Sequence, residues 1–208
     1  VMLAAIGIEG ANPLDIIVMW GDGFWKLLSF AMQMLLVLVT GFILATSPPV
    51  RRLLEWLAGF AKTAGAAIIM VTLVSLAASW LNWGFGLVVG AIFARELARQ
   101  VKVDYRLLVA SAYSGFVIWH GGISGSIPLT ISTPGHFTEG QIGIVPTSET
   151  IFSYWNLIIC ARLVSVIPIA HRMMMPDDHE KFILEPAQLH DAPEAPPPAN
   201  PTPAERLE

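Results

Sequence analysis

Two glycine-rich polar stretches of this sequence contain residue types that suit the binding of a small ligand. The first is Asn82-Trp-Gly-Phe-Gly86, and the second, at 119–134, reads WHGGISGSIPLTISTP. Glycines let the backbone turn and approach a ligand closely, and hydroxyl groups both donate and accept hydrogen bonds. The Asn82 amide could hold a cation through its oxygen or a carboxylate through its nitrogen. The candidate binding residues are Asn82, Gly84, Gly86, Gly122, Ser124, Gly125, Ser126 and Thr130.

Other side chains in or near these stretches each have alternative roles. His120 could carry a coupling proton, because histidine changes charge near neutral pH, or it could be a neutral packed residue. Arg162, in a later apolar run, could pair with a carboxylate, reach toward the membrane surface or bind a backbone carbonyl. Trp83, Phe85 and Trp119 could line a pocket for a short acyl chain or serve only in packing between helices. The sequence leaves these alternatives open.

The second stretch also contains a pattern found in rhomboid-like intramembrane serine proteases. Residues 122–125, GISG, match GxSG, and a serine in this role needs a base within hydrogen-bond reach. His136 falls in an outer loop and His171 at the cytoplasmic end of the last apolar run, which leaves His120 as the candidate base. A four-residue pattern within a glycine-rich segment is weak evidence for a protease. We therefore expect a protein without enzyme activity or cofactor. A serine hydrolase that uses Ser124 and a channel remain as alternatives.

The composition indicates an integral membrane protein. Of the 208 residues, 54% are apolar and only 13% are charged, and the mean hydropathy is +0.62, far from the values of soluble domains. Neither a basic stripe nor a zinc-spaced set of Cys and His residues occurs, so the sequence gives no indication of nucleic-acid binding. The single cysteine, Cys160, excludes an intramolecular disulfide within this sequence.

Apolar runs of spanning length divide the chain, since a helix needs about 20 residues to cross a bilayer. They lie at 24–46, 64–94, 107–133 and 151–170. Residues 1–8 are apolar but too short to span, and we interpret them as the remnant of a first span. Residues 1–176 then form a transmembrane repeat, and residues 177–208 form a proline-rich cytoplasmic linker. Both glycine-rich stretches interrupt long apolar runs, one at 64–94 and the other at 107–133.

Basic residues predict how these runs pass through the membrane. They flank the run at 64–94 on both sides: Arg51, Arg52 and Lys62 before it, and Arg95, Arg99, Lys102 and Arg106 after it. A single crossing would leave basic loops on both sides, against the preference of Lys and Arg for the cytoplasmic side. We therefore expect a re-entrant hairpin with its tip at 82–86, a broken span at 107–133 and an all-α polytopic fold. Non-helical backbone is tolerated at that depth only where it is buried in protein or lines a polar cavity.

Four segments resemble the bacterial short-chain fatty acid transporter family. They are NWGFGLVVGAIFARELAR at 82–99, WHGGISGSIPL at 119–129, MWGDGFWKLLSFAMQM at 19–34 and RMMMP at 172–176. The resemblance implies uptake of small monocarboxylates, such as acetoacetate or butyrate, across the bacterial inner membrane, coupled to H⁺ or Na⁺. It also implies a carrier of two inverted repeats, each with a re-entrant hairpin and a broken helix, of which this chain supplies the first. The expected partners are the substrate, the lipid bilayer, the second half of the carrier and, as an option, a second copy of the chain.

The resemblance and the two helix breaks together suggest where the substrate binds. Its carboxylate would be held by Asn82, by the hydroxyls of Ser124 and Ser126 and by backbone N–H groups at helix starts. The acyl tail would rest on an apolar wall. Because each methylene contributes only about 0.8 kcal/mol of transfer free energy, we expect modest selection among acetate, butyrate and acetoacetate.

Overall fold

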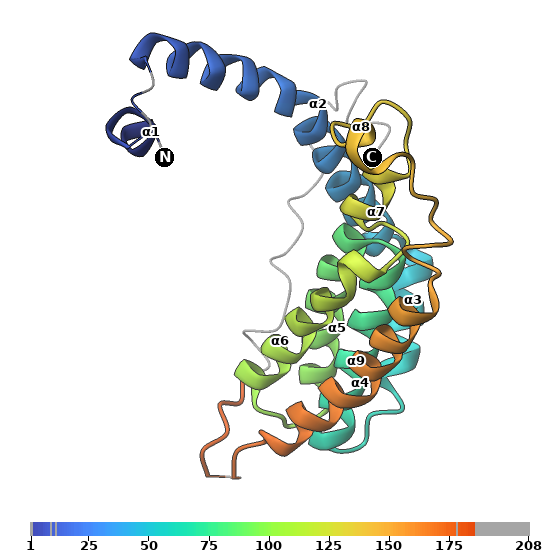
Figure 1. The fold of residues 1–208 in the computed structure, drawn as a ribbon. Helices are drawn as coiled ribbons and strands as arrows, with labels where there is room; N and C mark the ends of the chain where they lie inside the picture. The colour runs from blue at the N-terminus through green and yellow to red at the C-terminus, as the bar shows by residue number, and fades with distance from the viewer. Residues whose placement is uncertain (1, 9, 11, 178, 186–208) are drawn as a thin grey trace, which may run out of the picture.

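The computed structural model describes residues 2–8, 10, 12–177 and 179–185, and every regular element in that part of the chain is a helix. The predicted all-α class is therefore confirmed. Most of the linker predicted at 177–208 lies outside the described residues. The elements, labelled in Figure 1, are α1 (Met2–Gly7), α2 (Pro13–Thr46), α3 (Pro48–Ala58), α4 (Ala64–Leu81), α5 (Trp83–Gln100), α6 (Tyr105–Ser114), the 3₁₀ helix η1 (Gly115–Gly121), α7 (Ser126–Ile131), α8 (Glu139–Ile142) and α9 (Tyr154–Met173).

Several of these helices are long and apolar enough to cross a membrane. They are α4, the interrupted segment Tyr105–Ile131 and α9. Residues Ala31–Thr46 of α2 reach the required length and hydropathy only together with α3, and the two helices are bent by 62° relative to each other. The 18 residues of α4 make a helix about 27 Å long, close to the ~30 Å hydrocarbon thickness of a bilayer. The chain is a membrane protein.

The bend between α2 and α3 follows from the sequence Ser47-Pro48-Pro49. Ser47 is extended, with φ −63° and ψ 146°, and both prolines lie in the first turn of α3, where a missing N–H group costs little. In α3, Arg51, Arg52 and Glu55 are exposed. Its buried residues, Leu54 and Ala58, face the bundle. The start of α2, at Pro13 rather than at 24, projects away from the bundle (Figure 1).

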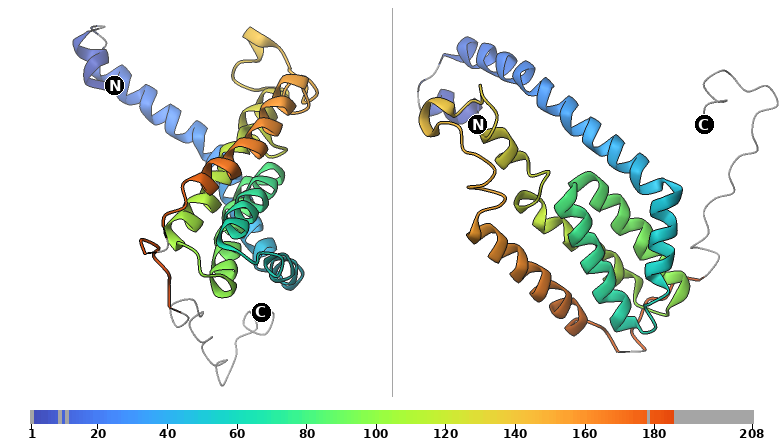
Figure 2. Two further views of the ribbon diagram at one scale, coloured as in Figure 1. Left: turned by 90° about the horizontal axis from the view of Figure 1, so that it is seen from below. Right: turned by 90° about the vertical axis from the view of Figure 1, so that its right-hand side faces the viewer.

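At the centre of the bundle, α4 and α5 form an antiparallel hairpin. Its two ends meet, because Thr63 before α4 and Val101 after α5 line one cavity. The hairpin packs between α2 on one side and η1 and α9 on the other (Figure 2). The second arm runs to Gln100, beyond the expected end at 94, so both arms have 18 residues. Its last turn is supported by a hydrogen bond of 2.8 Å from Gln100 to Glu96.

Small residues allow the hairpin to pack closely on itself and on η1. Thr72, Ser75 and Ser79 are buried along one face of α4. A Cβ added at Gly86 would lie 2.5 Å from the Ser79 Cα, and one added at Gly115 would lie 2.6 Å from the Ser75 carbonyl carbon. Such short distances leave no space for a side chain at either glycine. The glycines and hydroxyls of this stripe therefore serve helix packing, as small residues commonly do in membrane proteins.

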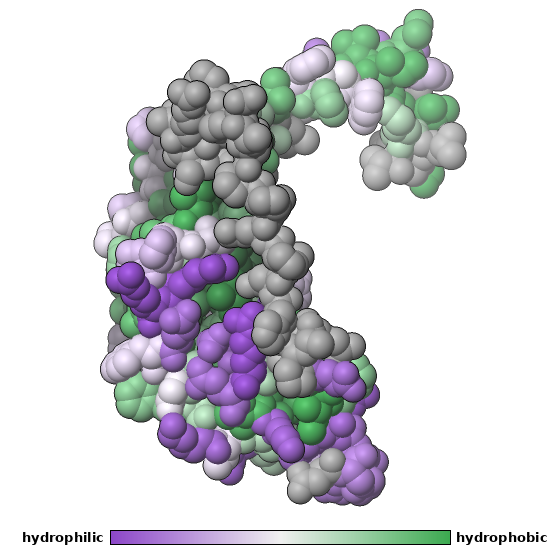
Figure 3. Space-filling model, turned by 180° about the vertical axis from the view of Figure 1, so that it is seen from behind, coloured by the Kyte–Doolittle hydropathy of each residue, from purple (hydrophilic) through white to green (hydrophobic). Residues whose placement is uncertain are grey.

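At the end of the bundle that contains the hairpin's loops, the chain after α9 is attached to the loop before α6. The Asp104 carboxylate caps α6 through Leu107 N, at 2.9 Å, and accepts Phe182 N at 2.7 Å. Arg106 pairs with the same carboxylate at 2.7 Å and donates to the Glu180 carbonyl at 3.0 Å. Burial opposes ionisation, but these hydrogen bonds outweigh it and lower the pKa of Asp104 from 3.8 to about 2. Figure 3 shows the opposite face of the molecule from Figure 1, and strongly hydrophilic residues gather in its lower half.

Candidate functional site

The tip of the hairpin is a single residue, Asn82, which ends α4 and begins α5. Its backbone is extended, with φ −153° and ψ 124°. Its side-chain oxygen accepts the N–H of Phe85 at 2.9 Å, which is the usual capping role of asparagine at a helix start. This hydrogen bond fixes the orientation of the amide, because the oxygen must face Phe85. The amide nitrogen of Asn82 therefore points away from the Phe85 N–H group.

The second break lies between η1 and α7, at residues 122–125. The 3₁₀ turns end when Gly122 becomes extended, with φ −99° and ψ 174°, and α7 starts after Gly125. A Cβ at Gly125 would lie 2.8 Å from the His120 carbonyl oxygen, so the chain folds back closely on itself here. In Figure 1, α7 and α8 lie beyond the tip of the hairpin. The hairpin tip therefore lies at the level of this break, and the re-entrant insertion of the hairpin stays a prediction.

The two breaks contact each other directly through hydrogen bonds that backbone N–H groups donate. Ile123 N donates to the Trp80 carbonyl at 2.7 Å, and Trp83 N donates to the Ser124 hydroxyl oxygen at 3.0 Å. A Cβ at Gly122 would lie 2.8 Å from the Trp80 Cα and closer still to its carbonyl oxygen, so only glycine fits. We call this contact, formed by residues 80–83 and 122–124, the joint. It brings Asn82 and Ser124, two predicted site residues, into one place.

The other predicted site residues lie around the joint in different roles. Gly84 packs against α2, where an added Cβ would lie 3.1 Å from the Leu38 Cα, and Gly86 packs against α4. The Ser126 hydroxyl lies 3.9 Å from the Met34 sulfur, and the Thr130 hydroxyl donates back to the Ser126 carbonyl at 2.7 Å. Direct contact of these four residues with a ligand stays a prediction.

An aromatic cluster covers the joint. The Trp83 ring lies 5.4 Å from Trp119 and 6.3 Å from Phe116, and the His120 ring stacks on Trp119 at 4.2 Å. Trp119 Nε1 donates to the Ser124 carbonyl at 3.3 Å. The Trp83 Nε1 atom is buried and has no hydrogen-bond partner within the described part of the chain. An apolar wall with one unused N–H donor therefore lies beside Ser124.

Two residues of α9 support the break and were missed by the sequence analysis. The Asn156 amide donates to the carbonyl of Gly121, at 2.9 Å, and to that of Ile151, at 2.7 Å. The Cys160 sulfur lies 3.7 Å from the Gly121 carbonyl oxygen. They satisfy a carbonyl that the end of η1 leaves without a helical partner. The signal for Asn156 was its amide inside an apolar run, a feature that usually has a purpose in a membrane protein.

Three side chains considered for other chemistry are not part of the joint. Arg162 is exposed on α9. His136 hydrogen-bonds the Gly143 carbonyl at 3.0 Å, in the segment between α7 and α9, and His171 lies in the last turn of α9. Within the described residues, the hydrogen bonds of Ser124 are to Trp83 and Trp119 and none is to a histidine. In the described part of the chain, no base in hydrogen-bond contact with Ser124 therefore supports the alternative of a serine hydrolase.

Comparisons with known proteins agree with the resemblance seen in the sequence. A family model described as "Short chain fatty acid transporter" matches residues 1–207. A protein of Escherichia coli (strain K12), named "Putative short-chain fatty acid transporter", is 45% identical over 207 residues, which cover 98% of this chain and 47% of that protein. A protein of the same name from Haemophilus influenzae (strain ATCC 51907 / DSM 11121 / KW20 / Rd) is 45% identical over 192 residues, 88% of this chain and 43% of that protein. The chain thus spans about half the length of the curated relatives it matches. No solved structure matches it.

Proposed function

The chain belongs to the short-chain fatty acid transporter family, and from this premise we propose that it forms part of a multi-pass carrier for short-chain monocarboxylates in the bacterial inner membrane. Butyrate and acetoacetate are the substrates we expect. The joint is the proposed binding site of the carboxylate. The observation that carries this proposal is the pair of hydrogen bonds, Ile123 N to Trp80 O at 2.7 Å and Trp83 N to Ser124 Oγ at 3.0 Å, through which two helix breaks meet.

The hydrogen bonds within the joint favour an anion over a cation. Asn82 and Ser124 both use an oxygen to accept a backbone N–H of the first turn of α5. Each oxygen keeps one further lone pair, but the groups with no partner among the described residues are the Asn82 NH₂ group and the Ser124 hydroxyl proton, and both are donors. The positive end of the α5 dipole adds to the same preference. A carboxylate accepts such donors, whereas a cation needs oxygen ligands.

The aromatic cluster gives the acyl chain an apolar surface. Trp83, Phe116 and Trp119 have ring centroids 4.9–6.3 Å apart and lie directly beside Ser124. We assign the wall of the substrate site to them, and the Trp83 Nε1 group is a third donor within this wall. Because burial of one methylene stabilises binding by only about 0.8 kcal/mol, acids that differ by one or two carbons should compete with one another.

The same proposal includes a second half of the carrier, which corresponds to the part of the relatives that this chain does not cover. This chain aligns with 47% and 43% of the two relatives, so a second half of comparable length would complete the carrier. In an inverted-repeat carrier the site lies between the halves, near the bilayer midplane. Uptake would be coupled to H⁺ or Na⁺, and imposing each gradient separately would distinguish the two ions.

The test is uptake of radiolabelled butyrate into proteoliposomes that contain the full-length carrier. Asn82→Ser keeps a helix-capping oxygen but lacks the amide donors, and Ser124→Ala removes the hydroxyl. Loss of one hydrogen bond to a charged group costs about 1.5–3 kcal/mol, so each variant should weaken apparent affinity roughly tenfold to a hundredfold. Ser165→Ala is the matched control, because among the described residues the Ser165 hydroxyl bonds within its own helix, to Ala161 O at 2.8 Å. Unchanged saturation curves for both site variants would refute the assignment.

A further inference from the structure

Helix α3 presents a different kind of surface on each of three sides. Successive residues of a helix are about 100° apart, so residues three, four or seven positions apart share a side. The inner side packs against the core of the bundle, with Leu54 3% and Ala58 0% exposed. Val50, Leu57 and Ala61 belong to the same cluster, which includes residues of α5. This side therefore fixes α3 to the second arm of the hairpin.

The second side of α3 is apolar and exposed. It consists of Leu53, Trp56 and Phe60, which we call the outer row and which are 51%, 61% and 58% exposed. Phe60 follows the end of α3, and its ring stays on this side because it contacts the Trp56 ring edge to face, with centroids 4.8 Å apart. A contiguous exposed surface of large apolar side chains indicates contact with lipid or with another protein.

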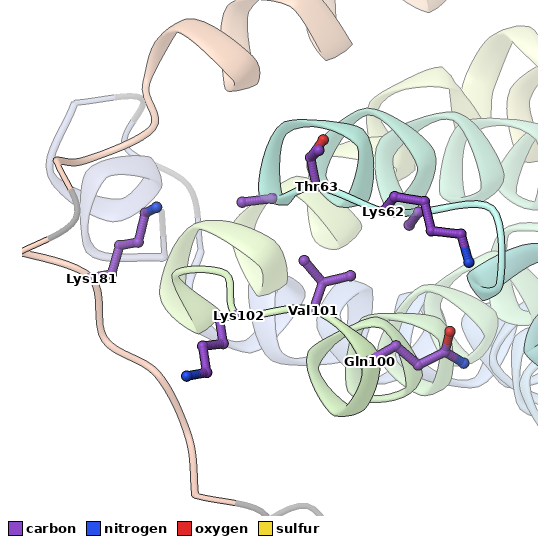
Figure 4. Close-up of a pocket in the computed structure, with 8 residues that line it drawn as sticks. Lys62, Thr63, Gln100, Val101, Lys102 and Lys181 are labelled. Atoms are coloured by element: carbon purple, nitrogen blue, oxygen red, sulfur yellow. The ribbon is translucent and has the colours of Figure 1, made fainter.

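The third side of α3 is polar. Arg51, Arg52 and Glu55 are exposed on it. Lys62, in the loop that follows α3, is also exposed, and Figure 4 shows its side chain directed away from Lys102 and Lys181. The inner side, the outer row and the polar side lie roughly 120° apart around the helix axis. The outer row therefore faces neither the bundle nor the charged surface of the same helix.

The bend before α3 determines how steeply this helix runs. It is turned by 62° from the second half of α2, and the turn is visible in the right-hand view of Figure 2. The 11 residues of α3 make a helix about 16 Å long, which at this angle advances only about 8 Å along the direction of α2. That distance is far less than the ~30 Å of the hydrocarbon core. It matches the depth of about 5–10 Å at which amphipathic helices lie in the membrane boundary.

We propose that α3 lies in the boundary of the bilayer at the end where the hairpin's loops lie, with its outer row among the acyl chains and its polar side among the headgroups. Tryptophan is enriched at this depth, and arginine side chains extend from it toward the headgroups. Because α3 packs against α5, its anchorage in the boundary fixes the depth of the hairpin's second arm. This inference does not depend on the proposed substrate site.

The sizes of the side chains favour lipid over a second polypeptide as the partner of the outer row. Contacts between helices within a membrane depend on small residues that let backbones approach closely. The contact inside the hairpin follows this rule, since a Cβ added at Gly86 would lie 2.5 Å from the Ser79 Cα. The outer row instead consists of one leucine and two large aromatic residues. Such side chains suit the fluid and adaptable surface of acyl chains.

The experiment measures the depth of single nitroxide labels in the full-length carrier, reconstituted in liposomes of phosphatidylethanolamine and phosphatidylglycerol. Native cysteines, Cys160 included, are first replaced by alanine. Leu53→Cys, Trp56→Cys and Phe60→Cys place the label on the outer row, and Arg51→Cys, Arg52→Cys and Glu55→Cys place it on the polar side. Power saturation compares how often each label collides with oxygen, which concentrates in hydrocarbon, and with a water-soluble nickel chelate. Ile159→Cys is the lipid reference, because the Ile159 side chain is 57% exposed on α9.

We expect the oxygen-to-nickel ratio to be several-fold higher on the outer row than on the polar side, and to approach that of the Ile159 reference. Three positions on each side make the result independent of any one label. Nickel-accessible labels on both sides would show that α3 lies in water and would overturn the inference. High ratios on both sides would place all of α3 in hydrocarbon and overturn it too. Labels on the outer row that neither reagent reaches would show that a polypeptide covers it, either the second half of the carrier or another copy, instead of lipid.

Discussion

Gly122→Ala is the most direct perturbation of the joint. The added methyl would lie 2.8 Å from the Trp80 Cα and closer still to the Trp80 carbonyl oxygen. Both atoms belong to the backbone of α4, so neither can rotate away as a flexible side chain would. The break and the hairpin tip must separate by several tenths of an ångström or more. The first bonds affected are Ile123 N to Trp80 O and Trp83 N to Ser124 Oγ, at 2.7 and 3.0 Å.

The expected cost follows from the contacts that are lost. Overpacking a closely packed site typically costs about 1–3 kcal/mol, and each buried polar group left without its partner costs about 1–3 kcal/mol. These contributions overlap, because separation of the backbones relieves the clash while it breaks the bonds. We therefore expect a destabilisation of about 2–4 kcal/mol, with loss of uptake because Asn82 and Ser124 no longer lie together.

Thermal inactivation in detergent and butyrate uptake together measure this effect. Gly140→Ala is the control, because nothing lies within 4 Å of an added Cβ at Gly140 and its backbone is helical. Gly122→Ala should lower the midpoint of inactivation clearly and reduce uptake at least tenfold, whereas Gly140→Ala should change neither. If the two variants behave alike, the tight contact between the breaks does not exist, and the carboxylate site derived from it fails as well.

Three further predictions concern other parts of the molecule. In a Cys160→Ala background, single cysteines at positions 52 and 102 should both be shielded from a membrane-impermeant thiol reagent in intact cells, and labelling of only one would show that the segment between them crosses the membrane. Asp104→Asn should speed hydrogen exchange at the Phe182 amide; in the parent, whose Asp104 pKa is lowered from 3.8 to about 2, the same contact should be complete above pH 4 and weaken as the pH falls toward 2. Residues 1–208 alone, reconstituted in liposomes, should show no saturable, butyrate-competed uptake, because they align with less than half of the relatives, and such uptake would point to assembly from two copies.

Charge distribution led to the expectation of a hairpin at α4 and α5, because it constrains topology without any knowledge of packing, and the side of the membrane on which its ends lie stays a prediction. Basic loops before and after one apolar run led to the expectation that both ends lie on one side. In the structure Lys62 and Lys102 line a single cavity. The extent of the second arm was less predictable. The charges of Arg95 and Glu96 suggested the start of a loop. In the structure both residues lie within α5, and Arg99 forms an ion pair with Glu96 at 3.1 Å.

The contact between the two breaks could not be read from the sequence. Each break has a local signature in glycines and hydroxyls, but residues about 40 positions apart meet only through tertiary packing, which periodicity does not encode. The same limit applies to the glycines, because a glycine next to a ligand and a glycine next to another helix look alike in sequence. Gly84 and Gly86 face α2 and α4. The buried hydroxyl residues of α4 could have been recognised from the sequence. Thr72, Ser75 and Ser79 recur at helical spacing, which indicates a face for close helix packing, and the sequence analysis did not use this pattern.

The identity of the residue at the hairpin tip has a physical explanation that combines fold and function. Asn, Asp and Ser cap a helix about equally well, so the cap on Phe85 N alone does not require asparagine. Asp would place a negative charge beside the proposed carboxylate and repel it. Ser would cap with its hydroxyl oxygen and leave a single O–H donor on that same atom. Only Asn caps with its oxygen, at 2.9 Å from Phe85 N, and still offers two neutral N–H donors. Asn82 can therefore hold the hairpin tip and bind an anion at the same time.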